Sequence, residues 1–244
     1  MTHCYLIPMF NEAGNLELLF ERLTANILVS DNFFLFVDDN SSDNSVEIIH
    51  SLFKDVEYHV IIKNINKGPG DSFNLGMEYL LNKYPNDENI RIITMEADNT
   101  SDIGILKDMI GISNLGYDLV LASVYAQGGG FSQTSVFRKV LSFVANMVFR
   151  AVFDIKILTL SSFYRVYSIN LLIKIKKSNN KIIEQSGFIC MLEILLKSIH
   201  QNALVVEVPM ILKSDIRKGK SKMKIFSNSI SYLKFLLTFK RNQL

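Results

Sequence analysis

Short runs of apolar residues alternate along the first half of the chain with segments in which apolar residues recur every three or four positions. Runs of the first kind predict buried strands, and segments of the second kind predict helices that turn one face toward a core. The expected strands cover residues 4–7, 33–37, 58–62, 91–95 and 118–123. The expected helices between the first four strands cover residues 16–27, 46–53 and 73–84, and Ser42 or Asp43 is expected to cap the second helix. This alternation predicts an α/β fold with a mostly parallel central sheet flanked by helices.

The second half of the chain has a less regular pattern, although the same two periods recur in it. Its expected helices cover residues 135–153, 187–200 and 225–239. Its expected strands cover residues 162–167 and 203–208, and Pro209 ends the second of them. A polar loop is expected over residues 213–224. Because no repeat, low-complexity stretch or linker interrupts the sequence, we expect residues 1–244 to form a single domain.

The composition raises the question of a membrane span, because 48% of the residues are hydrophobic and the mean hydropathy is +0.20. A spanning helix needs about 20 nearly uncharged residues. Residues 140–160 are interrupted by three charged side chains, and residues 225–239 form a shorter run that contains Lys234. The chain also begins without a basic segment followed by an apolar core. We therefore expect no transmembrane helix and a cytoplasmic location.

The formal net charge is +2, from 26 basic and 24 acidic residues, and this balance does not favour nucleic acid as a partner. Basic residues nevertheless concentrate between residues 213 and 241, where Asp215 is the one acid. Such a cluster attracts phosphate groups, whether on a substrate or on anionic lipid. The two cysteines and four histidines do not fall at metal-ligand spacing, so we expect buried, reduced thiols rather than a zinc site or a disulfide.

Four loops that follow the expected strands carry the candidate chemistry, because ligands of parallel sheets bind beyond the carboxyl ends of the strands. The loops are residues 7–12 (IPMFNE), 37–43 (VDDNSSD), 66–70 (NKGPG) and 95–102 (MEADNTSD). Three are rich in carboxylates, which repel a bare diphosphate but hold a divalent cation that in turn holds the diphosphate. Glu96 and Asp98 point to the same side of the chain, so we expect them to bind one Mg²⁺ or Mn²⁺. The third loop is expected to contribute Lys67 and Gly68 to substrate binding.

Each of these acids also has a plain structural interpretation. Glu96 and Asp98 could be solvated loop acids, or Asp98 could cap the next helix. Glu12 could be an ordinary acid in the first turn of a helix. Asp38 and Asp39 together exceed what a helix cap needs, so we assign both to nucleoside binding. Competing motifs are missing from the sequence, since neither a GxGxxG fingerprint nor a GxxxxGK[ST] loop occurs in it.

Taken in order, the four loops resemble those of the large family of inverting, GT-A-fold glycosyltransferases known as family 2. The second half is similar, more narrowly, to the polyprenyl- and dolichyl-phosphate sugar synthases. That similarity rests on Tyr125 with the glycines at 128–130, on Arg138, Ser142 and Asn146, on SFYRVY at 162–167, on EVP at 207–209 and on RKGKSK at 217–222. The resemblance runs from about Leu6 to Met223, and it implies a GT-A-like fold for nearly the whole chain.

The resemblance also implies roles for four groups of residues: contact with the nucleoside, binding of metal and diphosphate, contact with the phosphate of the acceptor, and closure over the nucleotide phosphates. In that order the groups are Pro8, Glu12 and Asp39; Glu96 and Asp98; Arg138 and Ser142; and Arg217 and Lys222. Asp98, Arg138, Arg217 and Lys222 are the expected catalytic residues. Residues 1–123 would be the nucleotide-sugar-binding half, residues 124–224 the acceptor half, and residues 225–244 a C-terminal amphipathic helix.

The expected activity is that of a metal-dependent inverting glycosyltransferase that moves a sugar from a nucleotide-sugar to a lipid-linked acceptor. A polyprenyl phosphate is the leading acceptor, and because it is already anionic it needs no general base. A saccharide hydroxyl would need one, and Glu184 or Glu193 is then the candidate. The helix expected at 135–153 could be a plain core helix. Alternatively, this helix or the one at 225–239 would lie in the membrane interface and hold the protein peripherally at the inner face of the cell membrane.

Two alternatives stay open at this point. The first is a transferase that acts on a saccharide hydroxyl in polysaccharide or O-antigen assembly. The second is a degenerate nucleotide-binding module without catalysis, because the chain departs from the family pattern at Glu96, Thr100, Val124 and Thr159.

Overall fold

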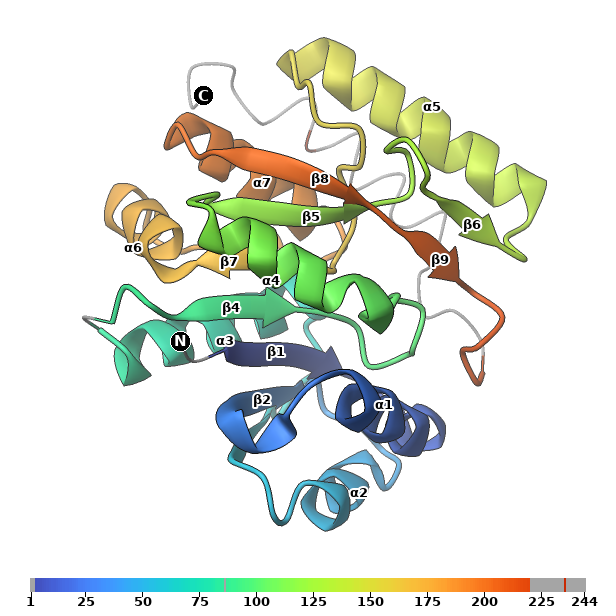
Figure 1. The fold of residues 1–244 in the computed structure, drawn as a ribbon, viewed down its shortest axis with the longest axis vertical. Coiled ribbons are helices and arrows are strands. Elements are labelled where there is room, and N and C mark those ends of the chain that lie inside the picture. The colour runs from blue at the N-terminus through green and yellow to red at the C-terminus, as the bar shows by residue number, and fades with distance from the viewer. Residues whose placement is uncertain (1–2, 86, 220–234, 236–244) are drawn as a thin grey trace.

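The computed structural model describes residues 3–85, 87–219 and Phe235, and its centre is a seven-stranded sheet (Figure 1). The strand order is β3-β2-β1-β4-β7-β5-β8. In chain order these strands are β1 His3–Met9, β2 Asn32–Asp38, β3 Tyr58–Ile62, β4 Arg91–Thr94, β5 Leu119–Ser123, β7 Arg165–Ser168 and β8 Val205–Pro209. Neighbouring strands are parallel except at β7, which is antiparallel to both β4 and β5. The predicted α/β class and the mostly parallel sheet are confirmed.

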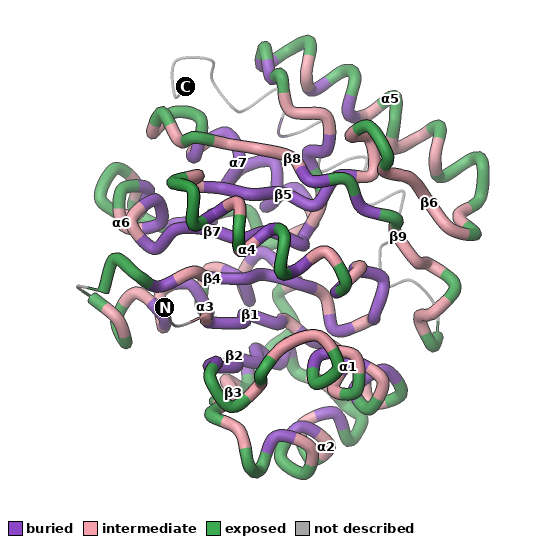
Figure 2. The backbone as a smooth tube through the Cα atoms, viewed as in Figure 1, coloured by how far each residue is buried: buried purple, intermediate pink, exposed green. Residues whose placement is uncertain are grey.

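Helices cover both faces of this sheet, because alternate residues of a strand face opposite sides and both sides here are apolar. Cys4 and Leu6 of β1 pack into the core shared with α3, α6 and α7, whereas Tyr5 and Ile7 pack into the core shared with α1, α2 and α4. The helices are α1 Ala13–Asn26, α2 Ser45–Leu52, α3 Pro69–Lys83, α4 Leu106–Asn114, α5 Val136–Phe153, α6 Ile169–Ser178 and α7 Cys190–His200, with 3-10 turns at Val29–Asp31 and Ile103–Ile105. Figure 2 shows the resulting buried layer along the strands. Cys4 and Cys190 are both buried in it, as predicted.

Helix α5 is packed less completely than the others. Its buried residues are Asn146, Phe149 and Phe153, and most of its length is exposed or half-buried in Figure 2. It runs beside a small second sheet in which β6 (Gly130–Ser132) pairs in parallel with β9 (Ile211–Lys213). The ring of Phe153 lies 6.2 Å from that of Phe235. The predicted helix at 225–239 otherwise lies outside the described residues.

Several expectations about local structure need correction. Asn44, not Ser42 or Asp43, is the N-cap of α2 and makes no side-chain capping hydrogen bond. The Asp43 carboxylate still accepts from the amide of Ser45, the first residue of α2, and from the amide of Ala13, the first residue of α1. The strand expected at 162–167 begins only at Arg165 and gives way to α6, which the pattern did not predict. Helix α4 and strand β6 were also missed. Among the described residues, no helix combines the length and the hydropathy that a membrane crossing requires.

Candidate active site

A cavity of about 1060 Å³ lies beyond the carboxyl ends of β1, β2 and β4. The loops that follow these strands form one side, and α5, the segment 159–163 and the segment 214–219 form the other. Nine of the residues chosen from the sequence line it: Pro8, Glu12, Asp39, Gly68, Glu96, Asp98, Arg138, Ser142 and Arg217. Asp38 and Lys67 do not line it, and Lys222 lies outside the described residues. Asp38 is buried, and its carboxylate accepts hydrogen bonds from the amide and hydroxyl of Ser41, so it shapes the turn after β2.

Glu96 and Asp98 stand together just after β4, on either side of the buried Ala97. Asp98 Oδ1 accepts hydrogen bonds from the amide and hydroxyl of Thr100, and Asp98 Oδ2 lies 3.1 Å from the guanidinium of Arg217. Burial, and then the negative charge of Asp98, raise the pKa of Glu96 above its ordinary value. The site therefore concentrates negative charge, and one positively charged group, the Arg217 guanidinium, already pairs with it.

These residues fit a divalent cation that arrives with a phosphate ligand. The described residues contain no group of three or more histidine, cysteine or acidic side chains that could hold a metal by themselves. Mg²⁺ is commonly bound through one or two carboxylates, with substrate phosphates and water completing its shell. Two carboxylates at the wall of one cavity match that mode of binding.

Asp39 is held by a buried lysine that the sequence analysis did not single out. Lys63 Nζ lies 2.6 Å from Asp39 Oδ1 and 2.7 Å from Asp71 Oδ2, and Lys63 and Asp39 are both buried. The Asp39 carboxylate also accepts hydrogen bonds from the backbone amides of Lys67 and Gly68, at 2.9 and 2.8 Å. Lys67, predicted to bind substrate, thus contributes its amide to the wall rather than its side chain to the cavity.

Gly68 is required where it stands, at the start of α3. Its φ of 91° belongs to the left-handed region, and a Cβ there would lie 2.7 Å from the carbonyl oxygen of Ser186. Its neighbour Gly70 donates a hydrogen bond from its amide to the same oxygen, at 2.7 Å. Residues 66–70 therefore form a fixed wall between Asp39 and the chain near residue 186.

The other end of the cavity is formed by α5 and is largely apolar. Arg138 and Ser142 lie four residues apart on that helix and therefore on one face. Ser142 Oγ accepts a hydrogen bond from the Tyr125 hydroxyl at 2.9 Å. Arg138 is exposed, and within the described ranges no carboxylate lies within ion-pair distance of it. The apolar lining at this end includes Leu141, Ala145, Phe149, Phe163 and Phe188.

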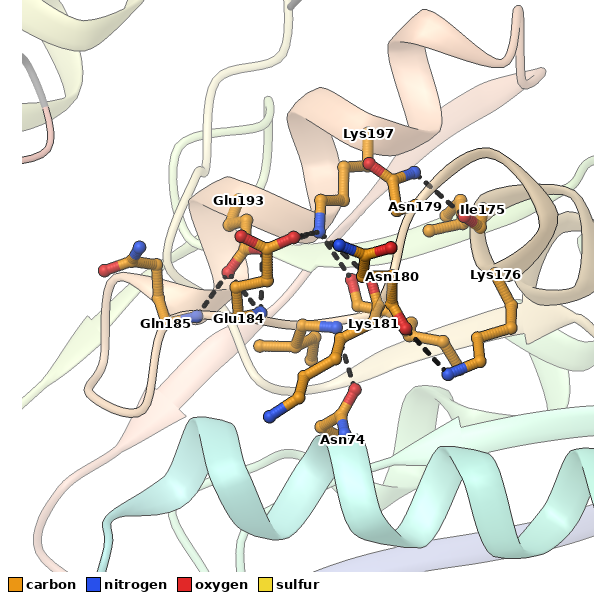
Figure 3. A network of polar contacts seen from close by, with 12 residues as sticks. Asn74, Ile175, Lys176, Asn179, Asn180, Lys181, Glu184, Gln185, Glu193 and Lys197 are labelled. Atoms are coloured by element: carbon orange, nitrogen blue, oxygen red, sulfur yellow. Dashed lines mark hydrogen bonds and ion pairs between the residues drawn. The ribbon is translucent and has the colours of Figure 1, made fainter. Parts of the chain in front are cut away.

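The two glutamates suggested as general bases lie elsewhere. Glu193 is buried on α7, accepts hydrogen bonds from the amides of Glu184 and Gln185, and pairs with Lys197 at 2.7 Å (Figure 3). Glu184 points to the same lysine at 3.7 Å. Neither glutamate lines the cavity, so that expectation was wrong. Instead, Glu193 anchors the loop that leads to Ser186 and supports the start of α3.

The fold has close counterparts among solved structures. Glucosyl-3-phosphoglycerate synthase from Mycobacterium tuberculosis superimposes with a TM-score of 0.67 at 13% identity, over 98% of this chain and 79% of that one. Its complex with Mn²⁺ and UDP-glucose also gives a TM-score of 0.67, at 12% identity, over 98% and 77% of the two chains. At such low identity the likeness defines the fold, which is GT-A-like as predicted.

Sequence comparison identifies the family. The model of glycosyl transferase family 2 matches residues 4–176, and the chain belongs to this family. The undecaprenyl-phosphate 4-deoxy-4-formamido-L-arabinose transferases of Yersinia enterocolitica and Yersinia pestis are each 31% identical to it over 145 residues. That alignment covers 59% of this chain and 41% of each relative, so the chain matches less than half the length of those proteins.

Proposed function

We propose that this protein is a metal-dependent, inverting glycosyltransferase that takes its sugar from a nucleotide-sugar and transfers it to a polyprenyl phosphate. One observation carries the donor side of this proposal: Glu96, Asp98 and Arg217 meet at a cavity beyond the ends of parallel strands. The structural neighbour bound to Mn²⁺ and UDP-glucose has the same fold and supports this assignment.

The reaction breaks the bond between the anomeric carbon and the diphosphate, and it forms a bond from an acceptor oxygen to that carbon. Glu96 and Asp98 would hold Mg²⁺ or Mn²⁺, which when bound offsets the charge that develops on the leaving diphosphate. Arg217, whose guanidinium lies 3.1 Å from Asp98 Oδ2, adds a positive charge beside these carboxylates. Glu12 and Asp39 line the cavity next to this group, where a nucleoside would lie, and Pro8 and Gly68 shape its walls. Lys222 is proposed to assist Arg217.

The acceptor side of the proposal rests on the contrast in chemistry along α5. Arg138 offers a cation without a competing carboxylate among the described residues, and Ser142 offers a hydroxyl one turn further along. Apolar side chains continue from there into the cavity. A phosphate attached to a long hydrocarbon matches this order of charge and apolar surface. The names of the Yersinia relatives include undecaprenyl phosphate, which agrees with an acceptor of this class.

The exposed face of α5 supports a peripheral location at the inner face of the cell membrane. Half of the large hydrophobic side chains that are exposed in the described part of the chain belong to this helix: Val136, Phe137, Val140, Phe143, Val144, Met147, Val148 and Val152. Three basic residues, Arg138, Lys139 and Arg150, lie on the same helix. Basic residues beside an apolar helix face favour the interface of an anionic bilayer. The acceptor could then enter the cavity beside the helix that contacts the lipid.

Two measurements test the proposal. The first follows thermal unfolding with UDP, GDP, CDP and dTDP, each with and without Mn²⁺, and we expect one diphosphate to raise the melting temperature in a Mn²⁺-dependent way. The second follows transfer of radiolabelled sugar from the matching nucleotide-sugar to undecaprenyl phosphate, with a lipid-linked saccharide as competitor. Label on the saccharide alone would identify the hydroxyl-directed alternative. Binding without release of sugar would identify a module without catalysis.

A further inference from the structure

Asn15 occupies an unusual position in the first turn of α1. It is 3% exposed, and its side chain bonds to one partner in the same turn, Glu12, and to one that lies 203 positions further along the chain, Lys218. Its Nδ2 donates to Glu12 Oε2 at 2.6 Å and to the carbonyl oxygen of Lys218 at 3.1 Å. Its Oδ1 accepts a hydrogen bond from the amide of Lys218 at 2.8 Å. The side-chain amide thus pairs with both backbone groups of one residue, as a neighbouring strand would.

The backbone of Asn15 makes a third connection. Its carbonyl oxygen accepts a hydrogen bond from Asn99 Nδ2 at 2.8 Å, and Asn99 follows Asp98 directly in the loop after β4. Asn15 therefore joins a predicted nucleoside contact, the acidic loop and the segment 213–218. The side-chain carbons of Lys218 also lie against Gly14, at 3.8 Å from the place where a Cβ would stand.

The segment held in this way carries Arg217 to Asp98. At its other end, the amide of Lys213 donates to the carbonyl oxygen of Thr100 at 3.0 Å, and Lys213 Nζ lies 3.1 Å from Asp102. The segment 213–218 is thus tied to the acidic loop where it starts and to Asn15 where it ends. Arg217, one residue before the Asn15 contact, has its guanidinium fixed 3.1 Å from Asp98 Oδ2.

Local helix capping does not account for the Asn15 side chain. The N-cap of α1 is Glu12, no side-chain hydrogen bond caps the helix, and the amide of Glu12 is bonded to Ser45 Oγ instead. Asn15 meets Glu12 through its own amide nitrogen, which leaves its oxygen free to accept from Lys218. An aspartate at this position could accept from the Lys218 amide but could not donate to Glu12 or to the Lys218 carbonyl oxygen. An alanine side chain could neither donate nor accept. The pairing with Lys218 therefore requires an amide at this position.

We propose that Asn15 is a positioning residue for the donor site: it clamps the backbone of Lys218 and thereby presents Arg217 to Asp98 and to the diphosphate. The second half of this statement rests on the proposed function. A guanidinium that is already placed loses less conformational freedom when a diphosphate arrives. Loss of the clamp should therefore weaken diphosphate binding through Arg217, although Asn15 itself does not line the cavity.

The test uses the full chain with Asn15→Ala and Asn15→Asp, and with Asn32→Ala as the matched control. Asn32 is also a buried asparagine with two side-chain hydrogen bonds, but it lies at the amino end of β2, away from the cavity. Amide hydrogen exchange of peptides that span residues 214–219 reports on the clamp without any nucleotide. Titration with UDP, GDP, CDP and dTDP, each with Mn²⁺, reports on the donor site, in the presence and absence of Arg217→Ala.

In both Asn15 variants we expect the Lys218 amide to exchange at least about tenfold faster, and diphosphate affinity to fall by about tenfold. Adding Arg217→Ala to Asn15→Ala should cause little further loss, because both changes remove the same contact. Asn32→Ala should leave both readouts unchanged even where it lowers the melting temperature. Unchanged exchange at Lys218, or losses that multiply in the double variant, would overturn the proposal. If the unaltered protein binds none of the four diphosphates, the proposed function fails, and the exchange data still decide whether Asn15 is a clamp.

Discussion

The two ends of the cavity differ in whether their charged side chains are paired within the protein. At the end proposed to bind the sugar donor (the donor end), the charged groups are paired within the protein: Asp39 with Lys63 at 2.6 Å, and Asp98 with Arg217 at 3.1 Å. At the end proposed to bind the acceptor (the acceptor end), Arg138 has no carboxylate partner among the described residues, and the cavity lining from α5 is mostly apolar. The donor end is therefore arranged before any ligand arrives, whereas the acceptor end leaves its charge available to one. Substitutions at the donor end should accordingly have the larger effects.

The largest effect is expected at Asp98. Asp98→Asn keeps the size of the side chain but removes a charge that both Arg217 and a divalent cation would use. We expect the rate of sugar transfer to fall by about 1000-fold or more, which corresponds to about 4 kcal/mol of lost transition-state stabilisation. Asp108→Asn, an exposed acid on α4, serves as the control and should transfer at the normal rate. A rate for Asp98→Asn within tenfold of the unaltered protein would contradict the assignment of the donor end.

The next effect is on stability and concerns Lys63. Lys63→Met leaves Asp39 buried without its cation, and removal of one partner of a buried ion pair typically costs about 3–5 kcal/mol. Asp71 is one-third exposed and keeps access to water. We therefore expect the free energy of unfolding, measured with urea, to fall by about 3 kcal/mol, the lower end of this range. Lys83→Met is the control, because it removes a partly exposed ion pair with Glu57 and a contact 4.5 Å above the Phe33 ring, which together should contribute less than about 2 kcal/mol. Equal losses in the two variants would show that burial of the Lys63 pair does not matter.

Lys63 is also an example of a residue whose role could not be predicted from the sequence. The strands of the first half were predictable because their apolar runs are continuous, and the acids after them because parallel strands end at one edge. Lys63 is a single lysine directly after the apolar residues Ile61 and Ile62, and it gives no such signal, since a lone lysine is usually solvated. Its burial follows from its ion pairs with Asp39, in the loop after β2, and with Asp71, in the first turn of α3. Asn15 was missed for the same reason, because its partner is 203 positions away.

The second half was harder to predict because its elements depend on tertiary contacts. The residues from 162 onward have the apolar character of a strand, yet β7 covers only Arg165–Ser168, and Ser168 then caps α6 by accepting from the Leu171 amide. The insertion of β7 between β4 and β5 cannot be read from a local period. β6 has three residues and is defined by its pairing with β9. By contrast, the helical period of its apolar residues predicted a helix over 135–153, and α5 covers Val136–Phe153.

At the acceptor end, the largest expected effect is on membrane binding. Phe137 and Phe143 are 70% and 56% exposed on α5. Replacing both with serine should weaken sedimentation with vesicles of phosphatidylglycerol and phosphatidylcholine by about 30-fold, or about 2 kcal/mol, because two partly inserted rings are lost. Ile62→Ser with Ile65→Ser is the control, since these side chains are similarly exposed near β3. If the control pair weakens sedimentation as much, α5 is not the face that contacts lipid.

A smaller effect is expected at Arg138. Arg138→Gln removes the charge that would contact the phosphate of the acceptor, so the KM for undecaprenyl phosphate should rise by about tenfold, or about 1.4 kcal/mol. The affinity for diphosphate with Mn²⁺ should stay the same, because Arg217, not Arg138, is the residue that pairs with Asp98. Arg150→Gln removes a charge from the same helix outside the cavity and should change neither quantity. A change in diphosphate affinity instead would mean that the two ends do not function separately.

The smallest effect is expected at Tyr125, whose hydroxyl donates to Ser142 Oγ across the cavity wall. Tyr125→Phe removes one neutral hydrogen bond, which contributes about 0.5–1.5 kcal/mol to stability. A double-mutant cycle with Ser142→Ala, followed by urea unfolding, should give a coupling energy of about 1 kcal/mol between the two residues. The same cycle applied to the KM for undecaprenyl phosphate separates two roles for Ser142. If Ser142 contacts the acceptor directly, Ser142→Ala should raise KM more than Tyr125→Phe does. Equal increases in KM would mean that Ser142 acts only by fixing Tyr125, and the acceptor end would then depend on internal pairing as the donor end does.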